Sequence, residues 1–69
     1  MMRDVRIAGE TIRLGQLLKL AELAASGAEA KQLLAAQLVR VNGELETRRG
    51  RQLRAGDTVE LAGESIQIQ

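Results

Sequence analysis

The chain has 69 residues, of which ten are basic and nine acidic, and it contains no Cys, His, Pro or aromatic residue. This length corresponds to one small domain, and the absence of Cys and His excludes thiol and imidazole catalysis, disulfides, and zinc or haem sites of the ordinary type. Hydrophobic residues make up 45% and charged residues 28%, which is typical of a folded globular protein rather than a disordered one.

The N-terminal third predicts extended structure followed by a helix. Apolar residues at Val5, Ile7 and Ile12 indicate either a short hairpin or two separate extended pieces. From there apolar side chains recur at helical spacing, which predicts a first helix over about 14–25; they are Leu14, Leu17, Leu18, Ala21, Ala24 and Ala25. Leu23 falls on the polar side of this helix, so either the helix is covered on two sides or Leu23 is exposed.

A second helix is predicted over about 28–37. Ser26, followed three residues later by Glu29, has the form of a capping box, in which each side chain satisfies a free backbone donor of the other residue. The short turn before it makes the two helices direct neighbours, so we expect a helical hairpin that buries one shared apolar surface.

The remaining segments predict β-strands. Asn42-Gly43 is typical of a hairpin turn. A three-residue turn with a bulge would place Val39 opposite Leu45 and Arg40 opposite Glu44, whereas a strict two-residue turn would place valines beside glutamates, so the bulged register is favoured. Further strands are expected at 58–62, with Val59 and Leu61 facing inward, and near the C-terminus, where Ile66 and Ile68 alternate with glutamines. The predicted fold is therefore a single α+β domain over residues 1–69, a two-helix hairpin packed on a small antiparallel sheet.

Charge is divided unevenly along the chain. Residues 31–54 contain six basic and two acidic groups, a net charge of +4, while the other 45 residues carry a net charge of −3. We expect the basic groups of this segment to form one surface over helix, strand and loop; they are Lys31, Arg40, Arg48, Arg49 and Arg51. Arginine binds phosphate oxygens bidentately, which favours a polyanionic partner, although composition alone leaves a merely solvated surface as the alternative.

The lack of aromatic residues restricts which nucleic acid is expected. Proteins that bind single strands usually stack bases on aromatic rings, and none is present here. Binding should therefore depend on phosphate and ribose contacts and on the shape of structured or double-stranded RNA. We expect replacement of Arg48, Arg49 and Arg51 by Ala to weaken RNA binding without changing the thermal midpoint. The carboxylates at 57, 60 and 64 have no neighbouring catalytic or metal-binding cluster, so an enzyme is not expected.

The order of these features resembles a known family. The residues that carry the resemblance are Arg13-Leu14, Leu17-Leu18, Ser26, Ala30-Lys31, Val39 to Gly43 and Ala55 to Val59. Over about residues 12–61 they are similar to the RNA-binding domain of the small-subunit ribosomal protein S-four type, also called the alpha-L RNA-binding motif. Since no second domain is evident, the chain looks like the small stand-alone bacterial members, the YbcJ-like proteins.

The resemblance implies a domain that docks on RNA and is not catalytic. Carried over by position, the family's RNA-binding surface corresponds to Lys19, Ser26, Gly27, Lys31, Arg40, Arg48 and Arg49, beside which Arg51 belongs to the same basic loop. Two positions depart from the family pattern: Gly27, which the stand-alone members share, stands where many fused members have Arg, and Gly15 replaces the acidic residue usual after Arg-Leu.

The leading hypothesis is a non-catalytic module that binds structured, ribosomal RNA, either alone or on a ribosomal particle. It needs no cofactor and no small-molecule substrate. No apolar run approaches the ~18 residues of a membrane span, so a cytoplasmic location without membrane contact is expected. The alternative is a protein-interaction adaptor that does not bind RNA, for which an exposed Leu23 would be the contact.

Overall fold

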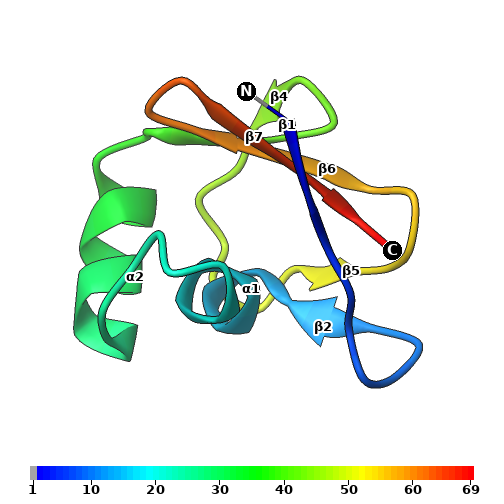
Figure 1. Ribbon diagram of the computed structural model, residues 1–69. Coiled ribbons are helices and arrows are strands. Elements are labelled where there is room, and N and C mark those ends of the chain that lie inside the picture. Colours follow the sequence, from blue (N-terminus) through cyan, green and yellow to red (C-terminus); the bar gives the residue numbers. More distant parts are fainter. Residues whose placement is uncertain (1) are drawn as a thin grey trace.

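The computed structural model describes residues 2–69. In chain order its elements are β1 (Met2–Val5), β2 (Ile12–Arg13), α1 (Leu14–Leu20), α2 (Gly27–Ala35), β3 (Val39–Val41), β4 (Glu44–Leu45), β5 (Gln52–Leu53), β6 (Thr58–Leu61) and β7 (Glu64–Ile68). Five strands form one sheet in the order β1-β7-β6-β3-β4, and β2 pairs with β5 in a second, two-stranded sheet. Both helices lie on one side of the larger sheet (Figure 1), which confirms the predicted α+β class.

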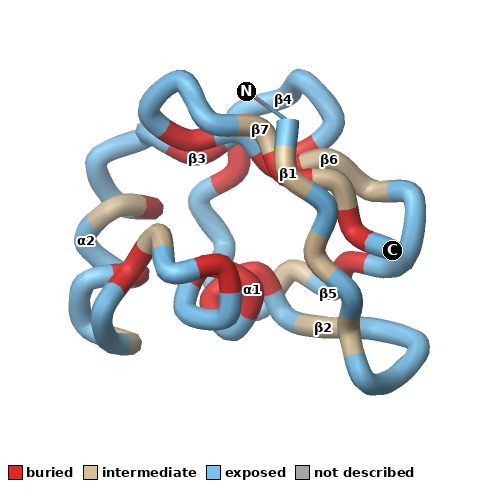
Figure 2. Tube along the Cα trace, in the orientation of Figure 1, coloured by how far each residue is buried: buried red, intermediate tan, exposed pale blue. Residues whose placement is uncertain are grey.

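The core lies between the helices and the larger sheet. Strands β3, β6 and β7 bury alternate residues, as a sheet with one solvated side requires. The predicted inward positions Val59 and Leu61 are buried, as are Ile66 and Ile68. From the helices Leu14, Leu17, Leu18, Ala30 and Leu34 complete this layer. Figure 2 shows the buried segments of helix and sheet facing the space between the two layers. Aliphatic side chains therefore fill the space between the two layers, and Glu46 is the buried charged residue among residues 2–69.

The first helix is shorter than predicted. It ends at Leu20 rather than near residue 25, and Glu22 takes a left-handed conformation with φ of 61°. The carbonyl oxygen of Leu18 accepts from the backbone N–H groups of both Leu23 and Ala24. This turn brings Leu23 into contact with the core, where it is half-buried. Neither of the two alternatives for Leu23 holds, because the helix ends before this residue and Leu23 is not exposed.

The β3–β4 hairpin has a two-residue turn, so the bulged register is wrong. Arg40 pairs with Leu45 and Val41 with Glu44. Asn42 and Gly43 both have positive φ, 51° and 84°, which is the type I′ geometry that Asn-Gly favours. The turn leaves Glu44 solvent-exposed at the edge of the sheet, so its position beside a valine requires no burial of charge.

The N-terminal residues form two extended pieces that belong to different sheets. β1 runs parallel to β7, with Met2 opposite Ser65, while β2 pairs antiparallel with β5. The larger sheet is therefore mixed, and β1 covers the edge that β7 would otherwise expose. Within residues 2–69, no helix is both long enough and apolar enough to cross a bilayer.

Candidate functional site

A hollow of about 370 Å³ lies where the start of α1, the start of α2 and the loop of residues 48–51 meet. Its lining consists of Arg13, Gly15, Gln16, Lys19, Gly27, Ala30, Arg49 and Gly50. Three of these residues are cationic and none is acidic. We call this site the basic hollow.

The loop of residues 48–51 is docked on the first turn of α1. The backbone N–H of Leu14 donates to the carbonyl oxygen of Arg51 at 2.8 Å, and the N–H of Gly15 donates to that of Arg49 at 2.9 Å. Helix N–H groups that would otherwise lack a partner are thus used to fix the loop. Lys19 follows Gly15 by four residues and so lies on the same side of the helix. The hollow therefore has a defined backbone frame on two of its sides.

The start of α2 forms the third side. Ser26 is the N-cap, and its Oγ accepts from the backbone N–H of Glu29 at 3.2 Å, which is the Ser26 half of the predicted capping box. Gly27 follows at the first helical position and faces the hollow without a side chain to fill it. Lys31 lies one turn further along the exposed side of α2, outside the lining.

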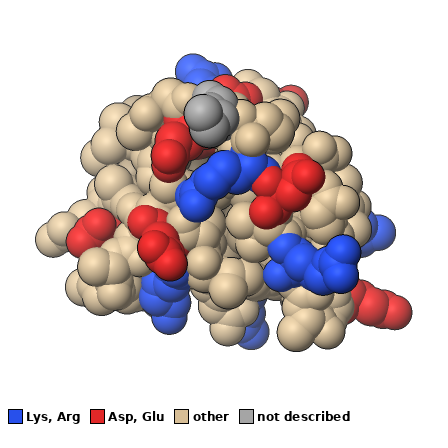
Figure 3. All heavy atoms as spheres, in the orientation of Figure 1, with Lys and Arg blue, Asp and Glu red and all other residues tan. Residues whose placement is uncertain are grey.

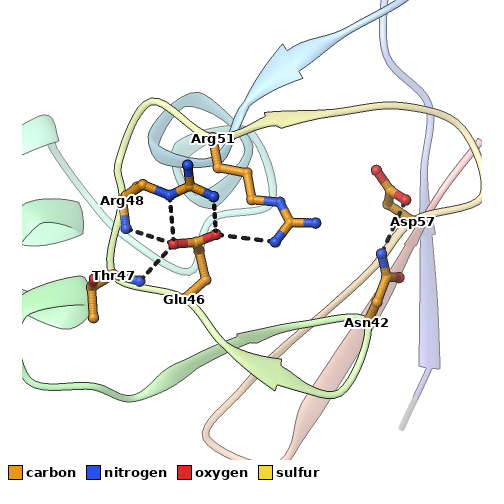
Figure 4. Close-up of polar contacts among 6 residues, drawn as sticks. All are labelled: Asn42, Glu46, Thr47, Arg48, Arg51 and Asp57. Carbon is orange, nitrogen blue, oxygen red and sulfur yellow. Dashed lines mark hydrogen bonds and ion pairs between the residues drawn. The ribbon is translucent and has the colours of Figure 1, made fainter.

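Glu46 holds the base of the same loop (Figure 4). Its side chain is 8% exposed and forms ion pairs with Arg48 and Arg51, each at 3.1 Å. It also accepts from the backbone N–H groups of Thr47 and Arg48 at 3.0 Å. The hydrogen bonds from the Arg48 side chain and backbone, with a smaller contribution from Arg51, outweigh the effect of burial and lower the pKa of Glu46 to about 2. The carboxylate therefore stays ionised and neutralises part of the loop's charge.

Arg40 lies on the opposite side of the sheet from the helices. Val39 and Val41 face the core, so the side chain between them faces outward. There Arg40 is paired in register with Glu60 of β6, and its Nη1 donates to the carbonyl oxygen of Gly43 at 3.3 Å. The expected convergence of Arg40 with the loop arginines is therefore wrong.

Comparison with known proteins identifies the family. A family model described as S4 domain matches residues 5–69. The chain belongs to the S4 domain family. This confirms the resemblance found in the sequence, and the S4 domain here has its basic hollow between the two helices and the 48–51 loop.

Relatives of this S4 domain cover most of its length. One is a probable ribosome maturation protein, RlbA of Bacillus subtilis (strain 168), which is 48% identical over 91% of this chain and 89% of its own. YbcJ of Escherichia coli (strain K12) is 44% identical over 83% of this chain and 81% of its own. The solution structure of YbcJ from E. coli, described as having an AlfaL motif involved in RNA-binding, gives a TM-score of 0.65 and 37% identity over 97% of this chain and 84% of that one.

The structure brings together only some of the residues predicted for RNA binding. Lys19, Gly27 and Arg49 line the basic hollow of the S4 domain. Ser26 caps the helix at its rim, and Lys31 lies on the exposed side of that helix. Arg48 and Arg51 are paired with Glu46 in the adjoining loop, although the Arg48 side chain is 73% exposed.

Sequence reasoning missed Arg13, Gly15 and Gln16. The available signal was the spacing of three residues from Arg13 to Gln16 and from Gln16 to Lys19, which places all three on one side of a helix start. The backbone N–H of Arg13 donates to Oε1 of Gln16 at 3.3 Å, which holds this end of α1. Gly15 gave no such signal, because its role depends on contact with a loop more than 30 residues later.

Charge is not uniform over the molecule. Figure 3 shows one face of the S4 domain, on which Lys and Arg groups alternate with Asp and Glu groups. Arg3 forms an ion pair with Glu64 at 3.9 Å, between side chains that are 41% and 49% exposed. The face drawn there is therefore mixed in charge, whereas the lining of the basic hollow contains no acidic residue.

Proposed function

We propose that this S4 domain is a non-catalytic module that binds the sugar–phosphate backbone of structured or double-stranded RNA, and that the RNA is ribosomal. The observation that carries the proposal is the basic hollow. Among residues 2–69, no carboxylate forms an ion pair with Arg13, Lys19 or Arg49. The relatives described as a probable ribosome maturation protein and as containing a motif involved in RNA-binding support the choice of a ribosomal RNA partner.

The chemistry of the hollow suits phosphate groups. The guanidinium groups of Arg13 and Arg49 can each donate two parallel hydrogen bonds to phosphate oxygens, while the ammonium of Lys19 acts as a point charge. The first turn of α2, behind Gly27, adds backbone N–H groups and the positive end of a helix dipole. None of these contacts reads a base, so recognition rests on the path of the backbone, which a folded RNA fixes and a flexible strand does not.

The test is binding to a fluorescently labelled hairpin of ribosomal RNA, compared with a single-stranded RNA and a duplex DNA of equal length. With three to five phosphates neutralised, the log–log slope of affinity against salt should lie between about −2 and −4.5. The double variant Lys19→Ala/Arg49→Ala should lose about tenfold or more in affinity for the hairpin. Arg6→Ala/Arg54→Ala, which removes two exposed cations outside the hollow, is the matched control and should bind normally.

Two results would contradict the proposal. Equal losses in the Arg6→Ala/Arg54→Ala control and the hollow variant, which remove the same charge, would mean that net charge, not this site, determines binding. Recovery of the protein with a protein partner at low salt, together with no affinity for any RNA, would favour the adaptor alternative.

A further inference from the structure

Gly15 lies directly against Arg49. The N–H of Gly15 donates to the Arg49 carbonyl oxygen at 2.9 Å. A Cβ at position 15 would lie 2.6 Å from Cγ of Arg49 and 3.3 Å from its Cδ, and the first distance is shorter than two carbon atoms can tolerate. The aliphatic stem of Arg49 therefore occupies the space that any other side chain at position 15 would need.

The backbone gives no reason for glycine at this position. Three glycines of the chain, Gly43, Gly56 and Gly63, have positive φ, and Gly15 is not among them. It lies in the first turn of α1, where alanine is the better helix former. What excludes a side chain is the contact with the Arg49 stem.

Packing on Gly15 is the contact that the structure shows for the Arg49 side chain. Among residues 2–69, the Arg49 side chain forms no hydrogen bond and no ion pair, in contrast to Arg48 and Arg51, which Glu46 holds. Arginine stems commonly lie along a neighbouring surface while the charged end stays in water. Gly15 supplies that surface at the edge of the basic hollow.

We propose that Gly15 is a positioning residue, which keeps the guanidinium of Arg49 at the basic hollow beside Arg13 and Lys19. The inference rests on the proposed function, since the expected ligand is RNA. A Cβ at position 15 would displace the stem of Arg49 and move its charge away from the other two cations. RNA would then lose one phosphate contact although no charge has been removed from the protein.

The experiment measures the affinity of Gly15→Ala, Arg49→Ala and the double variant for the labelled ribosomal RNA hairpin over a range of salt. Gly15→Ala should weaken binding about three- to tenfold and make the salt slope shallower by about 0.7–0.9, the value for one phosphate. Its thermal midpoint should be unchanged or higher, because alanine favours the helix. Once Arg49 is alanine, the further change at position 15 should have no effect, so the double variant should match Arg49→Ala.

The control is Gly9→Ala, at an exposed glycine outside the hollow whose nearest atom to an added Cβ lies 4.0 Å away; it should bind as wild type does. Wild-type affinity in Gly15→Ala would overturn the inference and leave the proposed function intact. An equal loss from Gly15→Ala in the presence and absence of Arg49 would also overturn it, because the effect would then not act through Arg49. Failure of the wild-type protein to bind any RNA at low salt would overturn the proposed function itself.

Discussion

Glu46 forms ion pairs with two of the loop arginines, Arg48 and Arg51. Among residues 2–69 it leaves Arg49 without a carboxylate partner. Its own carboxylate is almost fully buried, so its ionisation in the folded state depends on these hydrogen bonds. Replacing Arg48 and Arg51 would remove partners of a buried charge, and the triple arginine variant would therefore change stability as well as RNA contact.

We expect Glu46→Gln to lower the free energy of unfolding by about 1–3 kcal/mol at neutral pH, since the neutral amide has one acceptor oxygen and leaves part-buried donors poorly paired. The pKa of Glu46 is lowered from 4.5 to about 2 in the folded protein, so the ionised form favours folding. Its contribution is complete above pH 4.5 and is lost as the pH falls toward 2. Denaturant unfolding at a series of pH values should therefore show the wild type and the variant converging in acid.

The matched control is Glu44→Gln, at an exposed glutamate of the same hairpin, which should have little effect. Asp57 loses stabilising charge in acid as well, because the hydrogen bond from the Arg54 backbone N–H lowers its pKa, but this loss is common to all three proteins. A gap between wild type and Glu46→Gln that stays constant down to pH 2 would show that the carboxylate charge is not what stabilises the loop.

The identity of the basic loop was predictable from the sequence, but the division among its arginines was not. A count of charges treats Arg48, Arg49 and Arg51 alike. Which of them meets Glu46 depends on how the chain turns between residues 46 and 51, and that turn is set by hydrogen bonds to the start of α1. Interactions of this kind are tertiary, and no local pattern encodes them.

At the level of the elements, the Asn42 side chain ties the β3–β4 turn to β6. Its Oδ1 accepts from the backbone N–H of Thr58 at 2.9 Å, and its Nδ2 donates to Oδ1 of Asp57 at 3.1 Å. The same residue also tolerates the positive φ that the turn needs. Asn42 therefore forms part of the β3–β4 turn and also links this hairpin to the start of β6.

Two substitutions separate the side-chain hydrogen bonds of Asn42 from its tolerance of a positive φ. Asn42→Gly keeps the positive φ but removes both side-chain hydrogen bonds, and it should lower the free energy of unfolding by about 1–2 kcal/mol. Asn42→Ala adds the strain of a Cβ in the left-handed region, at a further cost of about 1 kcal/mol. Denaturant unfolding of both variants measures the difference. Wild-type stability in Asn42→Gly would show that the contacts with Thr58 and Asp57 contribute nothing.

Local signals predicted the starts of elements better than their ends. The start of α2 follows from Ser26, whose hydrogen bond with Glu29 is a local contact. The end of α1 has no glycine signal, because the left-handed residue after it is Glu22. Contact of Leu23 with the core stabilises this early ending. In the hairpin, the turn preference of Asn-Gly prevailed over the expected pairing of apolar residues.

On the scale of the whole molecule, the first and last strands pair with each other at one edge of the larger sheet. β1 runs along β7, and the N–H of Gln69 donates to the carbonyl oxygen of Val5 at 2.9 Å. Nη2 of Arg3 also donates to the carbonyl oxygen of Ala21 at 2.7 Å, which links this edge to the end of α1. A parallel pairing between residues 63 positions apart leaves no trace in local periodicity, so the sequence predicted the strands without their order.

Removal of residues 1–5 should therefore lower the thermal stability strongly and leave RNA binding at the basic hollow nearly unchanged. The deletion exposes the edge of β7 and uncovers part of the core in a domain whose size allows only ~3–5 kcal/mol of total stability, so a large fall in the thermal midpoint is expected. The control Met2→Ala/Asp4→Ala changes only exposed side chains and keeps the strand, so its midpoint should stay near that of the wild type.

Because the hollow is built from residues 13–50, the molecules of the deletion variant that remain folded should bind the RNA hairpin as the wild type does. Circular dichroism during heating, followed by titration well below the lowered midpoint, measures both quantities; weakened binding by a fully folded deletion variant would mean that the N-terminal strand itself contacts RNA.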